Sequence, residues 1–559
     1  MALSKSKIKK LKSRLDTLRL DRSNIEGIWE YIEQFVVPFK SALYENWSES
    51  SVNWRRWGIY DSTAVISNQI LASNIHSGLT NFSYRWLDFT FKGAAGRVLN
   101  KMQRPAGWLQ ENSEAVFDGI SESNFNVESN ESYLDISSFG TAHILKEVEV
   151  RNNSLDKFVF TAVPSNEAHF EDDYKGQPVY WFRELKWTAT QIFSKFDKKT
   201  IPEETVKRLE AKDTAGERVS VIFAIYPRKG RASSQYVQVR SIRPWGGCYF
   251  LESDLTQLGD EDGYYDFPVY IPRWRTTSGS RWGHSPAFVV LGDILTLNEL
   301  VKLVLTSAEK VIDPANLVTR RGIFGNVNLG PGDITVVADI EKSLRPYESG
   351  ARFDVSSLTK SDLQQSIKEA YYTNRLEIKK SPQQTATEVH AQFELMSRLL
   401  GPTHGRLLVD WINPMTLSSY GDMFRYKVLA PPPPEVQDAQ AEMKVEYHGP
   451  MARAQKMDEV QSIERLIGSV AQVSEKFPDA LDIIDIDEAV YNTAKFLGVP
   501  PEIIRDKTKI GTVRRLKKQV QELSQQIEMM QGAAGAAKDG AQAVASLEGT
   551  GQQIQGLLQ

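Results

Sequence analysis

The chain has 559 residues, 41% of them apolar and 25% charged, a composition typical of folded proteins and a length too great for one ordinary core. The net charge of −4 argues against a strongly basic protein that grips nucleic acid through its phosphates, and the single cysteine, Cys248, excludes an internal disulfide. We find no apolar run near the ~20 residues of a membrane span, and no apolar segment of a secretory signal behind the basic N-terminal stretch.

The first half of the chain divides into a helical part and a β-rich part. Residues 1–130 are expected to be mostly helical, because Ile25, Ile28, Trp29 and Ile32 recur at helical spacing and a second such stretch covers residues 61–79. Residues 133–272 are expected to be β-rich, since short apolar runs alternate there with Gly, Pro, Asn and Asp. These runs are residues 158–163, 179–182, 219–226 and 236–242.

Two long helices with a small β module between them are predicted in the centre of the chain. Ser285-Pro286 is a typical helix start and Asp313-Pro314 a typical end, which gives a helix over 286–312 about 40 Å long. Residues 313–355 are rich in Gly, Pro and Val, and this composition predicts the β module. The second helix is expected to begin at Ser361, where Ser361 and Gln364 match a capping box, and to continue to about Ile378.

The last third is predicted to be helical apart from a proline spacer. After the polar loop 379–384, Thr385 and Glu388 match another capping box, and Gly401-Pro402 is expected to end that helix. Prolines 431–434 indicate a stiff spacer. Further helices are expected over 406–428, 454–477, 486–497 and 510–530, and the Gly-, Ala- and Gln-rich residues 531–559 are expected to stay mobile. The predicted fold class is α+β, mainly helical.

The sequence shows no combination of residues typical of an enzyme. It contains no GxxxxGK[ST], HExxH or GxSxG pattern, so we expect no catalytic residue, no cofactor and no metal site. The acidic residues Asp260, Glu261 and Asp262 are interpreted as a solvated turn rather than a calcium loop. Basic residues within 1–22, and those at Arg514, Arg515, Lys517 and Lys518, are interpreted as solvated helix faces. Core or subunit packing is expected for five tryptophans, at positions Trp54, Trp57, Trp86, Trp274 and Trp282.

Three stretches carry a recognisable combination of residues. The first, within 56–89, contains Ile59-Tyr60-Asp61-Ser62-Thr63-Ala64 and Arg85-Trp86. The second, within 267–314, contains Gly283-His284-Ser285-Pro286-Ala287 and Thr296-Leu297-Asn298-Glu299-Leu300. The third, within 385–456, contains Thr385-Ala386-Thr387-Glu388-Val389 and Leu400-Gly401-Pro402. In this order and spacing, over roughly residues 25–505, the chain resembles the portal, or head-to-tail connector, family of short-tailed phages.

This resemblance implies a dodecameric ring at one capsid vertex, through which double-stranded DNA passes during packaging and ejection. It implies a portal fold with a wing, a two-helix stem, a small β clip and a helical crown. The corresponding segments are 1–284 (wing), 285–312 (first stem helix), 313–355 (clip), 356–378 (second stem helix), 379–384 (tunnel loop), 385–434 (wing and channel helices with the spacer), 435–530 (crown) and 531–559 (tail).

The resemblance also implies two groups of site residues. The tunnel loop, which faces the DNA in the family, consists of Lys379, Lys380, Ser381, Pro382, Gln383 and Gln384. The stem is represented by Asn298, Glu299, Lys302, Lys368 and Glu369. A solvated loop after a helix C-terminus explains the two loop lysines equally well, because cations are favoured there in any protein. The slightly acidic overall charge fits a channel in which DNA slides, since tight phosphate contacts would slow its passage.

The implied partners are further copies of the chain, the passing DNA, the packaging terminase, the major capsid and scaffolding proteins, and a tail adaptor protein. The implied location is the portal vertex of the virion, after assembly in the host cytoplasm, with no membrane involved. Two other classes stay open at this point: another virion structural protein, such as an internal core or adaptor protein, and an enzyme such as a nuclease acting at the packaging site.

Overall fold

The computed structural model describes most of the chain. The described residues are 3–40, 58–82, 85–100, 102–152, 154–214, 216–228, 243–277, 279–312, 316–318, 344–346, 353–376, 400–439, 442–447, 450–474, 485–486, 489–490, 493–494 and 507–534. They fall into two compact units. The main unit contains residues 1–89, 110–431 and 443–451, and the second unit contains residues 90–109, 432–442 and 452–559.

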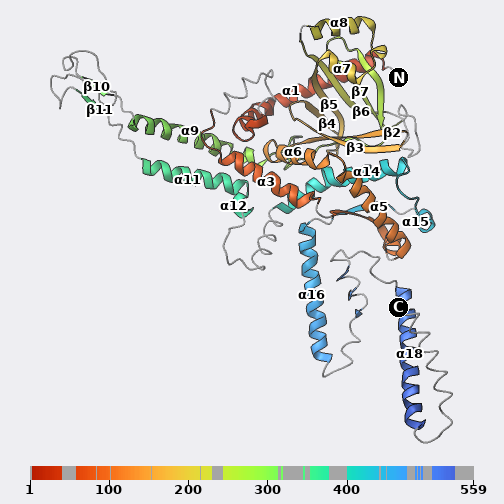
Figure 1. Ribbon diagram of the computed structural model, residues 1–559. Coiled ribbons are helices and arrows are strands. Elements are labelled where there is room, and N and C mark those ends of the chain that lie inside the picture. Colours follow the sequence, from red (N-terminus) through yellow and green to blue (C-terminus); the bar gives the residue numbers. More distant parts are fainter. Residues whose placement is uncertain are drawn as a thin grey trace. The chain divides into compact units, whose positions relative to one another are not determined.

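Helix α1 (Lys5–Phe35) begins the main unit and lies against a sheet (Figure 1). Ser4 caps the helix by accepting a hydrogen bond from the backbone N–H of Lys7. An apolar stripe, Ile8, Leu11, Leu15 and Leu18, recurs at spacings of three and four residues and is buried against the sheet. The helical prediction for this part is confirmed, with one continuous helix from residue 5.

The sheet under α1 has five antiparallel strands in the order β4-β5-β6-β7-β8. The strands are β4 (Ala168–Asp172), β5 (Pro178–Trp187), β6 (Val219–Pro227), β7 (Trp245–Leu251) and β8 (Gln257–Tyr264). Because side chains alternate between the two faces, Phe182, Ala224 and Cys248 face α1, whereas Phe223 and Tyr249 stack on the other side at 4.1 Å between ring centroids.

A second sheet has the strand order β3-β2-β9. Its strands are β2 (His143–Arg151), β3 (Ser154–Val163) and β9 (Val269–Tyr270). The predicted β-rich region is therefore confirmed in its main features. It also contains α7 (Ala189–Lys195), η2 (Lys198–Thr200) and α8 (Glu203–Thr214) between β5 and β6. The predicted run 236–242 lies outside the described residues.

The expected start of the β-rich region at residue 133 is wrong, because helix α6 (Phe125–Ser138) continues past it. The buried positions of α6, among them Phe125, Tyr133 and Ile136, are spaced for a helix that packs on α3 (Thr63–Leu79). Packing of Tyr133 and Phe125 against Trp411, at 5.1 and 5.8 Å between ring centroids, fixes the helix in the core.

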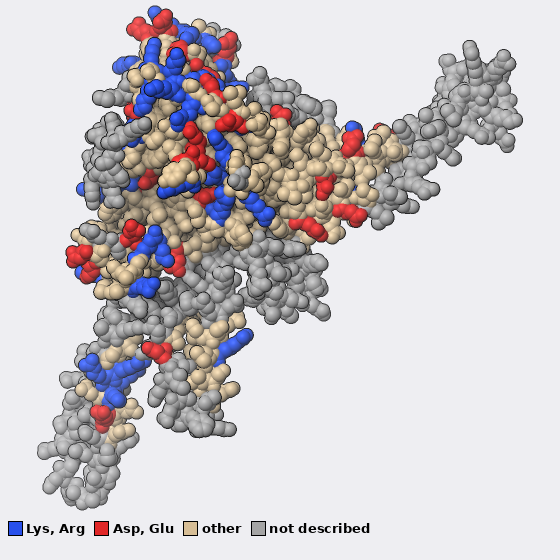
Figure 2. Space-filling view, turned by 180° about the vertical axis from the view of Figure 1, so that it is seen from behind, with Lys and Arg blue, Asp and Glu red and all other residues tan. Residues whose placement is uncertain are grey.

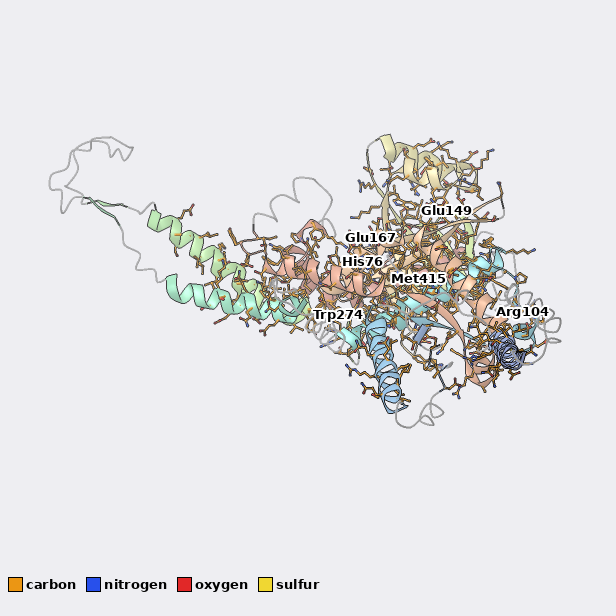
Figure 3. The ribbon with its side chains drawn as sticks, turned by 60° about the horizontal axis from the view of Figure 1, so that its bottom comes forward. His76, Arg104, Glu149, Glu167, Trp274 and Met415 are labelled. Atoms are coloured by element: carbon orange, nitrogen blue, oxygen red, sulfur yellow. The ribbon has the colours of Figure 1, made fainter. Side chains whose placement is uncertain are left out.

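Helices α9 (Pro286–Ile312) and α11 (Phe353–Ala370) run side by side away from the rest of the main unit (Figures 1 and 3). We call this pair the arm. The predicted bounds of the first helix are confirmed, with non-helical backbone angles at Val290 inside it. Beyond the ends of the arm helices, β10 (Asn316–Val318) pairs with β11 (Leu344–Pro346), so at least a two-stranded part of the predicted β module is present.

The prediction for the second arm helix is wrong at both ends. The helix begins at Phe353 rather than Ser361, so Ser361 and Gln364 lie inside it and form no capping box. It ends at Ala370 rather than Ile378, because Tyr372 adopts a left-handed conformation with φ of 59° before the short α12 (Thr373–Leu376). The following loop 379–384, and the predicted cap at Thr385 and Glu388, lie outside the described residues.

The helix around residue 400 does not end at Gly401-Pro402, as the sequence suggested. Residues 400–407 are helical and continue through a π-helical turn (Leu408–Ile412) into α14 (Asn413–Arg425). Leu400, Leu407 and Trp411 are buried along this path, and their packing outweighs the local preference of Gly and Pro. Met415 lies deep in the densely packed body of the unit (Figure 3).

The proline run and the strand that follows it differ in structure. Residues 431–433 are extended and Pro434 starts α15 (Pro434–Ala439), the helix position that proline favours. Strand β12 (Met443–Tyr447) pairs with β1 (Leu87–Phe91), a pairing that the sequence did not predict. The Tyr447 hydroxyl also lies 2.7 and 2.8 Å from the carbonyl oxygens of Gly78 and Leu79.

Further helices are α4 (Gly93–Leu99), α5 (Gln103–Ser121), α16 (Pro450–Ser474) and α18 (Lys507–Ala534). The predicted helices over 454–477 and 510–530 are thus confirmed, with α18 extending into the predicted mobile tail as far as Ala534. Most of the predicted helix over 486–497 and the remainder of the tail lie outside the described residues. Within the described part of the chain, no helix is long and apolar enough to span a membrane.

Candidate functional site: the arm and its anchor

The sequence-predicted site residues divide into two groups. The six tunnel-loop residues lie outside the described residues. All five predicted stem residues lie on the arm, with Asn298, Glu299 and Lys302 on α9 and Lys368 and Glu369 on α11.

The two arm helices are held together by a buried apolar seam with a polar contact beside it. Ile294, Leu297 and Val301 on α9 are buried, as is Ile367 on α11. Ser366 donates a 2.7 Å hydrogen bond to Asp293 across the helix pair. The described part of the arm is therefore a defined two-helix unit.

Asn298 on α9 attaches the arm to another segment of the main unit. Only 8% of Asn298 is exposed. Its amide group donates to the Gly58 carbonyl at 3.0 Å and accepts from the Tyr60 backbone N–H at 2.7 Å. Asn298 thus satisfies two backbone groups of the segment before α3 and fixes that segment to α9.

Asp61 extends this anchor to the second arm helix. One carboxylate oxygen accepts from the Thr63 backbone N–H at 2.8 Å at the start of α3, and the other accepts from the Gln364 side chain at 2.7 Å. We call Asn298, Asp61 and Gln364 the arm anchor. It joins α9, α11 and the start of α3.

The other predicted stem residues lie on the outside of the arm. Glu299 and Lys302 form an exposed ion pair at 3.2 Å, and Glu369 accepts from Gln365 at 3.0 Å. Lys368 is partly exposed. Exposed pairs of this kind contribute little to stability, so these residues are available to interact with something outside the subunit.

Helix α9 also exposes large apolar side chains. Val289 is 79% exposed, Leu303 56% and Leu305 53%. Gly292, close to Val289 along the helix, has open space where a side chain would begin. In Figure 2 the arm shows apolar surface between several acidic side chains and few basic ones, whereas both signs of charge crowd the end of the main unit that carries α8. Exposed apolar side chains of this size on one helix are typical of a surface that another chain covers.

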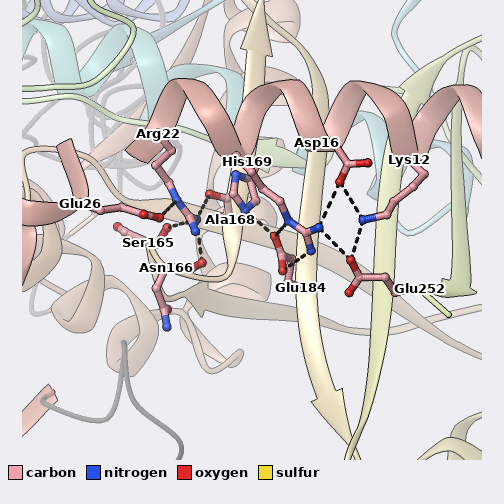
Figure 4. Close-up of polar contacts among 11 residues, drawn as sticks. Lys12, Asp16, Arg22, Glu26, Ser165, Asn166, Ala168, His169, Glu184 and Glu252 are labelled. Carbon is pink, nitrogen blue, oxygen red and sulfur yellow. Dashed lines mark hydrogen bonds and ion pairs between the residues drawn. The ribbon is translucent and has the colours of Figure 1, made fainter. Parts of the chain in front are cut away.

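The prediction of a solvated face for the basic N-terminal residues holds for Lys5, Lys9 and Lys10, which are exposed, but is wrong for Lys12, Arg19 and Arg22. Arg19 donates to both carboxylate oxygens of Glu184, at 2.7 and 2.6 Å, and Lys12 pairs with Glu252 at 2.6 Å (Figure 4). Arg22 donates to the carbonyl oxygens of Ser165, Asn166 and Ala168 (Figure 4). No local pattern could have predicted these contacts, because the partners lie far along the chain.

Glu184 is the centre of this network. Burial alone would raise its pKa, but the close contacts with His169 and Arg19 outweigh burial and hold the pKa well below its usual range. His169 itself is buried and lies 2.7 Å from Glu184, and its pKa is lowered chiefly by burial. The network attaches α1 to the five-stranded sheet and has a structural role.

A metal cluster and a reactive cysteine are two features on which an active site could depend. Among the described residues, no group of three or more His, Cys, Asp or Glu residues is arranged to hold a metal ion. Burial raises the pKa of the Cys248 thiol to about 12, so this thiol is not a nucleophile at neutral pH. The predicted solvated turn at residues 260–262 is wrong, because these residues lie in β8 and Glu261 pairs with Arg228 at 2.9 Å.

Two minor interpretations from the sequence are confirmed in the described residues. Trp86, Trp274 and Trp282 are buried and serve core packing, whereas Trp54 and Trp57 lie outside the described residues. Arg514, Arg515, Lys517 and Lys518 are exposed on α18.

Comparisons of the sequence with known proteins agree on one family. The family described as "Bacteriophage head to tail connecting protein" matches residues 8–504. The chain is 27% identical over 544 residues to a "Probable portal protein" of Bordetella phage BPP-1, covering 95% of each chain. It is 24% identical over 553 residues to the "Portal protein" of Salmonella phage epsilon15, covering 96% of each. A chain in the virion of a native gene transfer agent particle aligns with 76% of this chain and 90% of its own length, at 11% identity and a TM-score of 0.34.

Proposed function

Because the chain belongs to the family of bacteriophage head to tail connecting proteins, we propose that it is the portal subunit of a short-tailed phage. In this role it forms a ring at one vertex of the capsid, and double-stranded DNA passes through the ring during packaging and ejection. The observation that carries the proposal is the similarity to two portal proteins over at least 95% of both chains, because a match of that extent leaves no room for a different overall architecture.

The parts of the structure support an assignment within this architecture. The arm, with a strand pair between its helices, fits a stem and clip over residues 285–312, 313–355 and 356–378. The body of the main unit fits a wing, and the helices α16 and α18 fit a crown. In this assignment the loop 379–384 is the tunnel loop. The arm anchor then connects the stem to the wing.

The proposed mechanism is a conduit with weak contacts to DNA. The outer residues of the arm include both signs of charge, Glu299, Lys302, Lys368 and Glu369, and the whole chain carries a net charge of −4. Such a surface neutralises few phosphates, and each phosphate contact avoided removes a step of counterion exchange from the passage of DNA. Lys379 and Lys380 would act as local contacts, screened at physiological salt.

The proposal includes a ring of twelve subunits and no catalytic activity of its own. A separate terminase would supply the energy of packaging, and the ring would bind terminase, major capsid and scaffolding proteins, and a tail adaptor. Assembly would take place in the host cytoplasm. Exposed apolar side chains on α9 support ring formation, since a ring uses two different faces of each subunit and must cover both.

Negative-stain electron microscopy of the purified protein tests the proposal. We expect rings with a central hole, and no ATP hydrolysis or DNA cleavage by these rings. Monomers or filaments at micromolar concentration would favour the alternative, an internal core or adaptor protein of the virion. Metal-dependent DNA cleavage that co-purifies with rings and is lost on mutation of one acidic cluster would instead establish an enzyme.

A further inference from the structure

An open hollow lies between α1 and one end of the strands of the five-stranded sheet. Its volume is about 890 Å³, within the usual range for sites that hold a small ligand or several side chains. Side chains of α1 line one wall, and residues of β4, β5, β6 and β8 line the other. We call it the N-terminal hollow.

The N-terminal hollow is positively charged in a chain that is negatively charged overall. Its lining includes five basic and three acidic side chains. The basic ones are Lys7, Lys10, Arg14, Arg228 and Arg281, and the acidic ones are Asp21, Glu171 and Glu261. Residues 1–22 contain eight Lys and Arg and two Asp, a net charge of +6, so the remainder of the chain carries −10. Positive charge is therefore concentrated on the helix that forms this wall.

Several of these cations are held in place before any ligand arrives. The Arg14 guanidinium stacks over the Tyr180 ring at 3.8 Å and pairs with Glu171 at 3.1 Å. The Lys7 ammonium lies 4.3 Å from the centre of the Tyr226 ring. Cations stacked on aromatic rings lose less conformational freedom when a ligand binds.

Lys10 differs from the other cations of the hollow. Its side chain is exposed, and no other described residue forms an ion pair or hydrogen bond with it. Next to it, Leu11 and Leu18 of α1 and Pro227 at the end of β6 give the hollow an apolar part. A ligand that fits must therefore combine negative charge with an apolar group.

We propose that the N-terminal hollow binds an acidic segment of a partner protein, with carboxylates at Lys10 and Arg14 and an apolar side chain against Leu11 and Pro227. A peptide can place its carboxylates opposite the cations and leave gaps opposite Glu171, Asp21 and Glu261. A nucleic acid strand carries a phosphate on every residue, and would meet these three carboxylates at close range.

The test uses the full-length protein and three fluorescein-labelled probes, measured by fluorescence anisotropy at physiological salt. The probes are a short peptide of Glu-Glu-Leu repeats, its Gln-Gln-Leu counterpart and a single-stranded oligonucleotide of equal length. We expect the Glu peptide to bind and the Gln peptide not to bind. Binding of the oligonucleotide that is tighter than that of the Glu peptide would overturn the proposal and favour a nucleic acid surface.

Variants locate the binding site. Lys7→Glu with Lys10→Glu should weaken binding of the Glu peptide at least about tenfold, since the contact at Lys10 becomes repulsive and the second Glu makes the adjoining wall of the hollow negative. The matched control is Lys199→Glu with Lys207→Glu. Both lysines are exposed and lie outside the hollow, Lys199 in η2 and Lys207 on α8. This control changes the net charge by the same amount and should leave the affinity for the Glu peptide within about twofold of the parent. Equal loss in both double variants would mean a diffuse charge effect and would overturn the proposal.

A variant without any change of charge provides independent evidence. Ser13 lines the hollow and is exposed, so Ser13→Trp should fill part of it without disturbing the buried face of α1. We expect the same melting temperature as the parent and a several-fold weaker affinity for the Glu peptide. Unchanged affinity would show that the peptide binds elsewhere and would contradict the proposal.

Discussion

Gln364 on α11 donates a 2.7 Å hydrogen bond to Asp61, the residue that also accepts from the backbone at the start of α3. This single contact connects the arm to the core of the main unit across about three hundred residues of sequence. Asn298 on α9 makes the equivalent connection to Gly58 and Tyr60. Both arm helices are thus attached to one short segment of backbone, and the first prediction concerns this attachment.

Asn298→Ala should destabilise the subunit by about 1–3 kcal/mol, because it leaves a backbone N–H and a carbonyl without their partner in a mostly buried place. The measurement is urea denaturation of the isolated subunit followed by circular dichroism. Glu299→Ala at the adjacent, exposed position is the control, and should change stability by less than about 0.5 kcal/mol. Equal losses in the two variants would show that the arm anchor contributes no more than a surface residue.

Leu303→Asp should prevent ring assembly while the subunit still folds. Leu303 is 56% exposed in the single chain, so a carboxylate there is solvated until a neighbouring subunit covers it. Leu295→Asp should also prevent assembly, with some loss of subunit stability, because Leu295 is half-buried within the chain. Sedimentation velocity separates ring from monomer.

The control for Leu303→Asp is Tyr174→Asp, which changes a 91% exposed aromatic residue between β4 and β5. This variant should assemble like the parent. Normal rings from both Leu303→Asp and Leu295→Asp would show that α9 is not part of a subunit interface.

Replacing Lys379 and Lys380 with Glu, or deleting residues 379–383, should leave the ring assembled and reduce the retention of packaged DNA. In the proposed assignment residues 379–384 are a short polar loop that Pro382 separates from the next predicted helix, so a change there should not affect the arm. Thr385→Ala should reduce the retention of packaged DNA less, because it removes only a predicted helix cap worth about 1 kcal/mol. Packaged genome length in virions, measured beside ring assembly, is the test.

Full-length packaging and retention by the double Glu variant would mean that the two lysines are only a solvated loop. Failure of the deletion variant to form rings would mean that the loop is structural, and that its proposed position in the channel is wrong.

Glu184→Gln should lower stability by about 1–3 kcal/mol at neutral pH, since Arg19 loses its charged partner. The pKa of Glu184 is lowered in the fold, so its carboxylate stabilises the fold fully above the ordinary Glu value of 4.5, and this stabilisation is lost as the pH falls below that value. The difference in unfolding free energy between the parent and Glu184→Gln should therefore shrink as the pH falls below about 4.5. Denaturation curves over this range measure it.

Glu149→Gln is the matched control, because Glu149 forms an ion pair with Lys157 in which both side chains are 55% exposed. It should change stability by less than about 0.5 kcal/mol at every pH. A difference between the parent and Glu184→Gln that is constant across pH would mean that the charge of Glu184 is not what stabilises the contact.

The family resemblance could be seen in the sequence, and several elements could be predicted from local patterns alone. Helix 286–312 was predicted correctly at both ends because its start, its uninterrupted run and its end are all encoded by neighbouring residues. The same holds for strand β6, whose apolar run and flanking breakers are local. The implied roles of the tunnel-loop residues stay predictions, since they lie outside the described part of the chain.

Tertiary structure decided what local patterns could not. Ser361 and Gln364 match a capping box, yet Gln364 bonds to Asp61, which lies far away in the sequence. Gly401 and Pro402 favour a helix end, yet burial of Leu400, Leu407 and Trp411 stabilises a continuing helix. The basic side chains of α1 look solvated in the sequence, but Arg19 and Lys12 find Glu184 and Glu252 on strands that reach them only in the folded chain. A sequence pattern reports the preferences of adjacent residues, whereas the free energy of these contacts depends on groups that only folding brings together.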